Sequence, residues 1–286
     1  MKTHTLILIV TAILACATTH LTKAQEPDSL HIQATIHDLR THSWALGTGS
    51  SNLLDTYLSP LNYTGIHATL LRETLRMTRH CHHRISFQTL IQATFASTTN
   101  PSSTAHDYSG RLSYKAAWHY NWTPLTNLRL MAGGMAGAHA GILYNDRNGN
   151  NPAQGRFNID IAISAMAIYH LHIRRQRLSL RYQINMPIMG VMFSPQFGQS
   201  YYEIGQGNRD KNAVFTHPGN TPCLWQQLTV DIPIGKTTTL RAGYLSDITQ
   251  SHTNSIKTHD WSHSFMIGLV KHFVKVKKQN RTNGIL

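Results

Sequence analysis

The chain alternates between apolar and polar positions over unusually long stretches. In residues 157–173 every odd position is apolar or aromatic, whereas the even positions include Asp160, Ser164 and His170. A period of two residues predicts a β-strand with one apolar face and one polar face. Strands in globular proteins are usually about five or six residues long, so this segment is too long for an ordinary β-sandwich.

The same alternation recurs along the whole chain. In 111–122 the even positions carry Leu, Tyr, Ala and Trp side chains, and they alternate with Arg111, Lys115 and His119. Ten strands are predicted in all, at 42–49, 65–77, 83–95, 109–122, 127–143, 156–173, 176–190, 224–232, 237–246 and 261–274.

Long amphipathic strands predict an all-β fold, a transmembrane antiparallel up-and-down β-barrel. In such a barrel the apolar face contacts lipid, the polar face lines the lumen, and closure pairs every strand edge. Trp118, Tyr120 and Trp122 cluster at one strand end, as in an aromatic girdle. The alternative is a soluble barrel or sandwich with its apolar face inside, and strand length favours the membrane. Eight or twelve strands stay open, because 65–77 mixes its faces around Glu73, which predicts a bulge or a register error there.

The predicted connections alternate between short and long. Short connections are expected at 78–82, 123–126, 174–175 and 233–236, and long ones at 50–64, 96–108, 144–155, 191–223 and 247–260. Outer-membrane barrels have tight periplasmic turns and long extracellular loops. The pattern therefore predicts that both ends of the barrel chain lie in the periplasm.

The N-terminal segment has the features of a secretory signal peptide. A positive start precedes a compact apolar run at 6–17, and Ala24 followed by Gln25 is the expected cleavage site. Lipidation at Cys16 is the alternative. The predicted divisions are a signal peptide at 1–24, an outer-membrane barrel at 25–274 and a basic periplasmic tail at 275–286.

Charge indicates what the surface contacts. The formal net charge of +13 falls to +11 when Lys2 and Lys23 leave with the signal peptide. A basic surface suits phosphate-rich partners, so outer-membrane lipid and lipopolysaccharide are expected, together with the barrel-assembly machinery. Nucleic acid is not expected, because the protein is exported and carries no binding motif. Cys81 and Cys223 are predicted at opposite ends of the barrel, which argues against a disulfide between them.

The predicted lumen is rich in charge. A ten-stranded barrel is narrow enough for its own side chains to fill much of the interior. We therefore expect ion pairs to plug it, and a narrow anion-preferring pore is the alternative. The glycine-rich segment 131–141 predicts a close approach, with 55–65 or 191–223 as candidates for a loop folded inward. The predicted lumen cluster is Arg84, Arg111, Lys115, Arg129, Asp160, Arg177, Arg181, Asp231 and Arg241.

Three parts of the sequence contain residue types found in metal, calcium or hydrolase sites, but each also has a simpler interpretation. "TRHCHHR" (78–84) contains metal-ligand residue types, yet neighbouring residues of a tight turn do not converge on one ion. Residues 146–150 alternate Asp and Asn as calcium loops do, with only one carboxylate. A rim hydrolase would draw on loop residues, although no spacing assigns them roles. These loop residues are Ser200, Asp210, His217, Asp247, His252, His259 and Asp260. No catalytic, metal or cofactor residue is predicted.

Four segments carry a resemblance to a known family. They are "SNLLDTYLSPLNYTG" (51–65), "YNDRNGNNPAQG" (144–155), "FSPQFGQSYYEI" (193–204) and "FMIGLVKHF" (265–273). With them the chain resembles the uncharacterised outer-membrane β-barrel proteins typical of Bacteroidota, a family of unknown function. The resemblance implies location and architecture and brings no catalytic residues.

The sequence therefore predicts an integral outer-membrane barrel whose role is structural or is to bind a ligand or partner through extracellular loops. The extracellular ligand is not specified by the sequence, and nothing in it points to an enzyme. The alternatives are an outer-membrane hydrolase with a His, Asp and Ser site at the rim, and a narrow anion-preferring pore.

Overall fold

The computed structural model describes residues 39–78, 81, 84–173, 176–235 and 237–274. Almost all of these residues lie in β-strands. The strands are β1 (Leu39–Asp55), β2 (Ser59–Met77), β3 (Ile85–Thr99), β4 (His106–Leu125), β5 (Leu128–Asn145), β6 (Ala153–Ile173), β7 (Gln176–Phe193), β8 (Ala213–Thr216), β9 (Leu224–Pro233), β10 (Thr238–Thr253) and β11 (Ile256–Val274), with one short helix, α2 (Tyr201–Gly205). No helix in this described part is long and apolar enough to cross a membrane.

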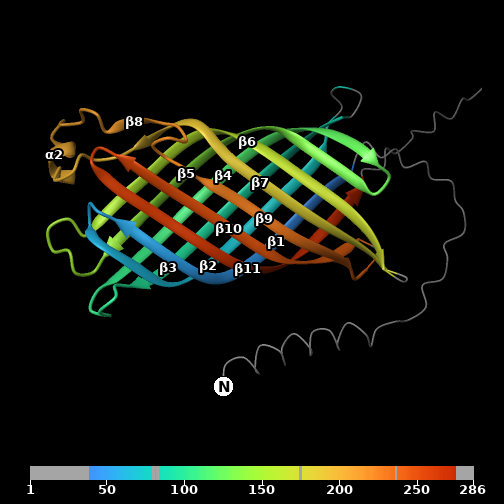
Figure 1. Cartoon of the computed structure of the whole chain (residues 1–286), viewed down its shortest axis with the longest axis horizontal. Helices are drawn as coiled ribbons and strands as arrows, with labels where there is room; N and C mark the ends of the chain where they lie inside the picture. Colours follow the sequence, from blue (N-terminus) through green and yellow to red (C-terminus); the bar gives the residue numbers. More distant parts are fainter. Residues whose placement is uncertain (1–38, 79–80, 82–83, 174–175, 236, 275–286) are drawn as a thin grey trace, which may run out of the picture. The chain divides into compact units, whose positions relative to one another are not determined.

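The long strands close into a barrel (Figure 1). Each pairs antiparallel with its neighbours in sequence, and β1 closes the ring by pairing with β11 from Leu39↔Val274 to Asp55↔Thr258. The short β8 pairs only with the end of β7. The ring therefore contains the long strands β1 to β7 and β9 to β11, which confirms the predicted ten-stranded antiparallel up-and-down barrel.

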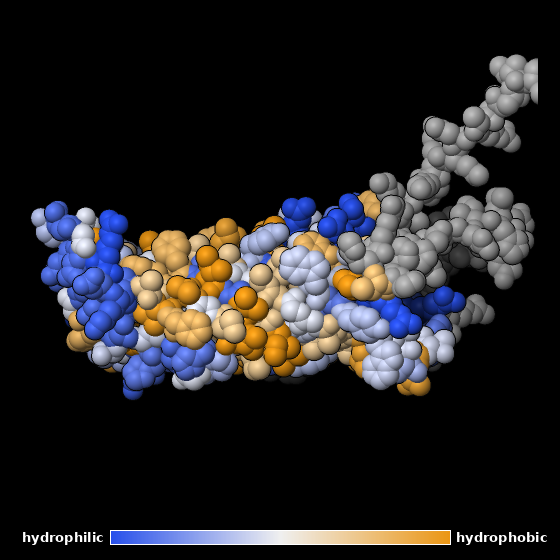
Figure 2. All heavy atoms as spheres, turned by 90° about the horizontal axis from the view of Figure 1, so that it is seen from above, coloured by the Kyte–Doolittle hydropathy of each residue, from blue (hydrophilic) through white to orange (hydrophobic). Residues whose placement is uncertain are grey.

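The predicted faces are also confirmed. In β4, Leu112, Trp118 and Trp122 are 54, 53 and 60 % exposed, whereas the alternating Lys115 and His119 are 6 and 0 % exposed. The exposed residues of the long strands are mainly apolar, and the buried residues are mainly polar. Figure 2 shows the result on one side of the barrel, where apolar residues cover the middle and hydrophilic ones gather at one end. An apolar belt around a polar interior is the pattern of an outer-membrane-type barrel.

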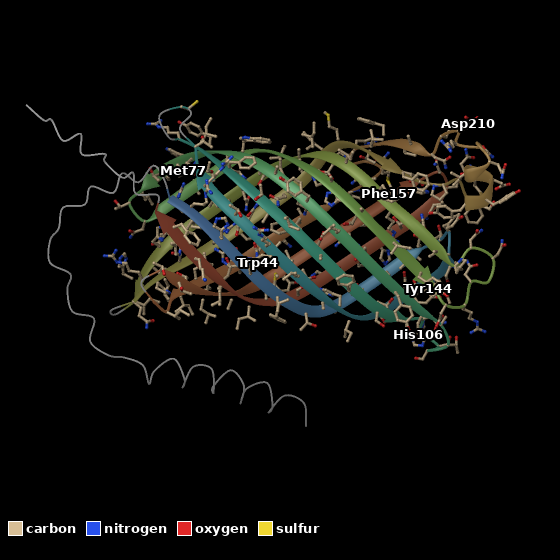
Figure 3. All side chains as sticks on the ribbon, turned by 180° about the vertical axis from the view of Figure 1, so that it is seen from behind. Trp44, Met77, His106, Tyr144, Phe157 and Asp210 are labelled. Atoms are coloured by element: carbon tan, nitrogen blue, oxygen red, sulfur yellow. The ribbon has the colours of Figure 1, made fainter. Side chains whose placement is uncertain are left out.

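We call the two ends of the barrel the terminus end and the loop end. The terminus end holds Leu39, Val274 and the β2–β3, β4–β5, β6–β7 and β9–β10 connections, and the loop end holds the others. Met77 and Asp210 lie at these opposite ends (Figure 3).

The predicted alternation of short and long connections is wrong at two places. The β1–β2 connection is only 56–58 and the β10–β11 connection only 254–255, because these strands continue well beyond their predicted ends. Residues 50–64 and 247–260 are therefore mostly strand. Their many small polar residues still satisfy the backbone by pairing across the ladder, as Ser51↔Ser262 does.

The bulge predicted in 65–77 is also absent, since β2 pairs with β3 without a shift from Thr64↔Thr99 to Met77↔Ser86. Its faces mix for another reason. Leu71 points inward with Glu73 and both are 3 % exposed, while Arg72 points outward and places its guanidinium 5.0 Å from the centroid of the Trp44 ring. The strand simply carries apolar residues such as Leu71 on its inner face and the cations Arg72 and Arg76 on its outer face.

An irregularity occurs instead in β7. Pro187 pairs with Ala162 but Met189 pairs with Ile161, so Ile188 is an extra residue. Proline cannot donate to a ladder, and strands accommodate it at bulges. Within the described pairing, residues 186–189 of β7 meet neither β9, which ends its ladder at Asn185, nor β8, which begins at Gly190.

The chain between β8 and β9 separates from β7 at this break and runs alongside β10 instead. The backbone N–H of His252 donates to the Asn220 carbonyl at 2.8 Å, and the Cys223 thiol donates to the Gln250 carbonyl at 3.7 Å. The wall of the barrel is therefore irregular between β7 and β9 in its loop half.

Candidate functional site

The terminus half of the lumen is crossed by a polar layer centred on Glu73. The Glu73 carboxylate accepts hydrogen bonds from Gln88 Nε2 at 2.6 Å, Arg241 Nη1 at 2.7 Å and both Nη atoms of Arg181. Arg241 also donates Nε and Nη2 to the two oxygens of Asp231 at 2.7 Å each. Two guanidinium groups are thus neutralised by two carboxylates in one plane.

The polar layer spans the full width of the barrel. Glu73 lies on β2 and Arg181 on β7, strands that face each other across the ring. Gln88 and Gln183 exchange two side-chain hydrogen bonds of 2.9 Å, and both are 0 % exposed. Ten strands leave a lumen that long side chains of this kind can bridge.

An apolar belt adjoins the polar layer on its loop side. Its buried members lie on six neighbouring strands, from β9 through β11 and β1 to β3, and are Ala45, Leu71, Leu90, Trp225, Leu245 and Met266. Trp225 also donates Nε1 to Gln92 Oε1 at 2.9 Å. A hydrophobic constriction of this kind opposes the passage of ions because it does not hydrate them.

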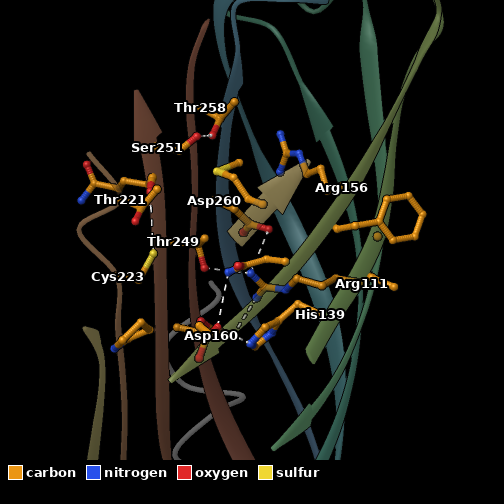
Figure 4. A pocket seen from close by; sticks show the side chains of 18 of the residues that line it. Arg111, His139, Arg156, Asp160, Thr221, Cys223, Thr249, Ser251, Thr258 and Asp260 are labelled. Carbon is orange, nitrogen blue, oxygen red and sulfur yellow. Dashed lines mark hydrogen bonds and ion pairs between the residues drawn. The ribbon is translucent and has the colours of Figure 1, made fainter. Parts of the chain in front are cut away.

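The loop half of the lumen contains a cavity of about 120 Å³ (Figure 4). That volume is on the order of what a few water molecules or a benzene-sized ligand occupy. The lining is mixed, with charged residues from β4, β5, β6, β10 and β11 and apolar residues from β5, β7 and β9. The cavity is therefore suited to a small amphipathic molecule.

Most charges around the cavity are paired. Arg111 lies 2.7 Å from Asp247 and 3.5 Å from Asp260. Arg156 Nη2 donates to Asp55 Oδ2 at 2.8 Å, from β6 across the ring to β1. These pairs join opposite walls, as the interactions of the polar layer do.

Lys115 is the exception. It lines the cavity and is 6 % exposed, and its Nζ lies 4.9 Å from the centroid of the Trp225 ring. Among the described residues its ammonium makes neither a hydrogen bond nor an ion pair.

His139 joins a hydroxyl to a carboxylate at the cavity wall. Its Nδ1 lies 2.8 Å from Ser113 Oγ, and its Nε2 lies 3.0 Å from Asp160 Oδ2. Gly137 makes room for this group, since a Cβ at that position would come within 2.9 Å of Asp160 Oδ1. At Gly137 the groups that approach are side chains of the wall, whereas the glycine-rich strand was predicted to mark a close backbone approach or a bend.

Residues 194–212, which we call the lid, contact the connections at the loop end. The Tyr57 hydroxyl donates to the Gln199 carbonyl at 2.7 Å, and Tyr201 Oη accepts from the Gly155 N–H at 2.7 Å. Asn254 Nδ2 donates to the Ser194 and Lys211 carbonyls at 2.9 Å each. Burial, together with neighbouring Tyr201 and Asp55, raises the pKa of Tyr57 to about 12. The 191–223 segment was one of two candidates for a loop folded into the lumen. Its residues 194–212 contact the loop end, and it reaches the cavity through Ser194, Thr221 and Cys223.

Several predicted lumen residues lie elsewhere than expected. Arg84 is corrected: it lies outside the strands, is exposed, and donates to the hydroxyl of Tyr120, which is on the outer face. Arg84 was placed in the lumen by extending the alternation of β3 back to residue 84. Because Arg84 lies in the turn before β3, that alternation does not apply to it. Arg177 shares the face of Arg181 but is exposed, because it is the second residue of β7 and lies at the terminus end of the barrel. Arg129 is half-buried and donates to Asn121 Oδ1 at 3.0 and 2.8 Å.

The other predicted residues are brought together in two groups. Arg181, Asp231 and Arg241 belong to the polar layer, and Arg111, Lys115 and Asp160 surround the cavity. Sequence reasoning missed Glu73 as the centre of the first group and His139 in the second. The signal was present for Glu73, because a lone carboxylate between leucines marks a polar position with a buried partner.

The loop residues named for a rim hydrolase do not assemble. Ser200 caps α2 by pairing with Glu203, and His217 Nδ1 accepts from the Gly219 N–H. His259 Nε2 lies 2.9 Å from Asn52 Oδ1, and Asp247 and Asp260 pair with Arg111 inside the lumen.

The polar atoms of the calcium-like segment 146–150 hold the turn together. Asp146 Oδ1 accepts the His106 N–H at 2.8 Å, and Asn148 Oδ1 accepts the N–H groups of residues 150 and 151. Cys81 is exposed and Cys223 half-buried, and both are free. Most of the 78–84 segment, the cleavage site at Ala24 and Gln25, Cys16 and the basic tail lie outside the described residues.

Comparisons with known proteins give one family and several similar solved structures. No curated protein matches the sequence. The outer membrane protease OmpT from Escherichia coli is similar at 8 % identity, covering 84 % of this chain and 98 % of that chain, with a TM-score of 0.46. The transport unit of the autotransporter AIDA-I from Escherichia coli is similar at 8 % identity, 93 and 97 % coverage and a TM-score of 0.44. The beta domain of the Bordetella autotransporter BrkA is similar at 11 % identity, 82 and 99 % coverage and a TM-score of 0.40.

Similarity at these scores assigns no activity to the chain. The family comparison is more extensive, because a family model described as "Protein of unknown function (DUF3316)" matches residues 6–280. The chain, a closed ten-stranded barrel of the outer-membrane type, belongs to this DUF3316 family.

Proposed function

We propose that the protein is a non-conducting outer-membrane barrel that binds a small ligand inside its lumen. Residues 1–24 direct export and are removed before Gln25, the barrel-assembly machinery inserts the mature chain, and the apolar face contacts lipid and lipopolysaccharide. The connections at the terminus end face the periplasm and the lid faces outside. The resemblance of residues 51–65 and 193–204 to Bacteroidota barrels supports an outer membrane of that phylum.

One observation carries the non-conducting role. The Glu73 layer and the apolar belt lie in series between the cavity and the terminus end, and their side chains are buried. An ion would have to break a buried charge network and then cross an unhydrated constriction, and both steps are costly. The cavity on the other side of this block is enclosed by residues of both signs, which favours binding over transit.

A planar-bilayer measurement tests this role. The wild-type protein should insert without stepwise conductance at moderate voltage. The double variant Glu73→Ala with Arg181→Ala removes bulk from the layer while leaving the net charge unchanged, and we expect a measurable leak from it. Regular conductance steps from the wild type would refute the non-conducting role and favour the narrow pore.

Fractionation tests the location. The mature protein should require detergent for extraction, and its gel mobility should change on heating, as folded outer-membrane barrels do. A protein that stays soluble without detergent would contradict the membrane assignment.

Hydrolysis is a second candidate function, and the Ser113, His139 and Asp160 group favours it. The three residues have the order of contacts of a hydrolytic triad, hydroxyl to imidazole to carboxylate. Against it, Ser113 is 3 % exposed and does not line the cavity. Turnover of an activated ester that Ser113→Ala abolishes and Ser109→Ala leaves unchanged would establish hydrolysis, and equal rates in the two variants would exclude this group.

A further inference from the structure

We propose that the cavity binds a small organic carboxylate, with its anionic head on Lys115 and its apolar body against the wall that contains Trp225. This inference deepens the proposed function, since it names the ligand class for the same cavity. It rests on the one cation lining the cavity that makes neither an ion pair nor a hydrogen bond among the described residues, and on the apolar surface beside it.

The first step is the pairing of charges around the cavity. Arg111 is held by Asp247 and Asp260, Arg156 by Asp55, and Asp160 by His139. Lys115 faces this same set, and none of its carboxylates lies within ion-pair distance of the Lys115 ammonium. Each of these carboxylates is already engaged by Arg111, Arg156 or His139, so among the described residues Lys115 is the one cation of the set that makes no ion pair.

The second step is the cost of that arrangement. A buried ammonium without an ion-pair or hydrogen-bond partner is costly, because nothing in contact with it replaces its lost hydration. The Trp225 ring offers a cation–π contact on one side only. An ammonium has three N–H donors, and a carboxylate that enters the cavity would accept from those that Trp225 leaves free. A single unpaired charge selects a monoanion over a dianion.

The third step is the surface next to Lys115. Met135, Pro187, Met192, Leu224 and Trp225 contribute apolar side chains to the cavity lining. A volume of about 120 Å³ limits the enclosed part of the ligand to about the size of a benzene ring or a short alkyl chain. An aromatic or short-chain carboxylate meets both conditions, whereas a free inorganic anion would leave the apolar wall unused.

The break in the barrel wall allows two sources of the carboxylate, the aqueous phase and the membrane. Pro187 and Met192 line the cavity from β7. Thr221, Cys223 and Leu224 line it from the chain that runs alongside β10. The cavity thus borders the stretch of β7 that has no partner on the side of β8 and β9 in the described pairing. A short carboxylate would lie wholly inside the barrel, while a long-chain carboxylate from the membrane would place its chain through this break.

Calorimetry on the detergent-purified full-length protein tests the proposal. Hexanoate should bind, and hexanamide, which has the same shape without the charge, should bind at least tenfold more weakly. Lys115→Met keeps the side-chain stem and removes the charge, so hexanoate affinity should fall by roughly 30-fold, toward the amide value. Lys257→Met, at an exposed lysine near the loop end, should leave both affinities unchanged.

Cys223 provides an independent readout. In a Cys81→Ser background, hexanoate should slow the reaction of Cys223 with a small thiol reagent, because the thiol lines the same cavity. Tighter binding of palmitate than of hexanoate, with the same protection, would assign the ligand to the membrane. Binding of hexanoate alone would assign it to the aqueous phase.

Three results would overturn the inference: no hexanoate binding to the wild type, equal affinity for acid and amide, or undiminished binding to a folded Lys115→Met variant. The acid and amide comparison uses the wild type, so it does not depend on the folding of a variant. The same preparation is tested for conductance. A silent barrel that fails to bind hexanoate refutes the ligand class alone, and a conducting barrel refutes the proposed function.

Discussion

Replacing Glu73 by glutamine isolates the charge at the centre of the polar layer. Glu73→Gln keeps the shape and removes the negative charge that Arg181 and Arg241 share. Arg241 retains two hydrogen bonds to the Asp231 carboxylate, but Arg181 loses its only carboxylate and retains amide oxygens as acceptors, Gln183 among them at 2.7 Å. The variant therefore leaves one guanidinium buried without a carboxylate.

The cost follows from that burial. Removing one partner of a buried ion pair destabilises a protein by about 3–5 kcal/mol, and we expect the lower end because Arg241 stays paired. With a urea dependence of about 3 kcal/mol per molar, the midpoint of unfolding should fall by about 1 M. Tryptophan fluorescence of the barrel folded in lipid vesicles gives this midpoint.

A double-mutant cycle separates charge from packing. In Glu73→Gln with Arg181→Gln both charges are absent, so the stability should return to within about 1 kcal/mol of the wild type, because a neutral layer has no buried excess charge. Arg84→Gln, at an exposed position outside the lumen, should change stability by less than about 0.5 kcal/mol. A Glu73→Gln variant as stable as the wild type, or a double variant no better than the single one, would refute the reasoning.

Three further predictions concern other parts of the barrel. Gly137→Ala should cost about 1–3 kcal/mol, because the new Cβ would press on Asp160, whereas Gly134→Ala on the same strand has open space and should be nearly neutral in the same urea titration. Leu90→Ala should cost about 2–5 kcal/mol by leaving a hole in the apolar belt, and an equal loss from outward-facing Leu112→Ala would contradict a special role for the belt. The pKa of Glu203 is lowered because the Ser200 N–H and hydroxyl donate to its carboxylate. A lowered pKa contributes stability that is present above the unfolded value and is lost as pH falls through the folded one. Acidification to below about pH 4 should therefore loosen the lid, seen as faster proteolysis there, and Glu203→Gln should remove that pH dependence.

The strands were predictable because alternation is a local property. The side chains of a strand point to opposite sides in turn, so the outward faces around Trp118 and Ile163 follow from residue types alone. The ends of the strands were less accessible. Ser51 and Ser262 look like loop residues by composition, yet they pair with each other because their partner strands continue alongside.

The pairing of charges depended on the ring. Glu73 and Arg181 are far apart in sequence and meet only because β2 and β7 face each other across a ten-stranded barrel. The sequence could place Arg111, Lys115 and Arg241 on the polar face, but not say which would find a carboxylate. Arg84 was misplaced for a related reason, since the turn before β3 interrupts the alternation at that residue.

By itself the sequence determined that this chain forms long amphipathic strands, apolar on one face and polar on the other, and therefore a barrel. Only the tertiary structure decided that the terminus half of the lumen is crossed by the Glu73 layer, and that residues 186–189 of β7 have no strand partner on the side of β8 and β9 in the described pairing. It also decided that Lys115 makes no ion pair among the described residues. The physical reason is that hydrophobic periodicity depends on near neighbours along one strand. Charge neutralisation in a narrow lumen depends instead on which side chains the closure of the ring brings face to face.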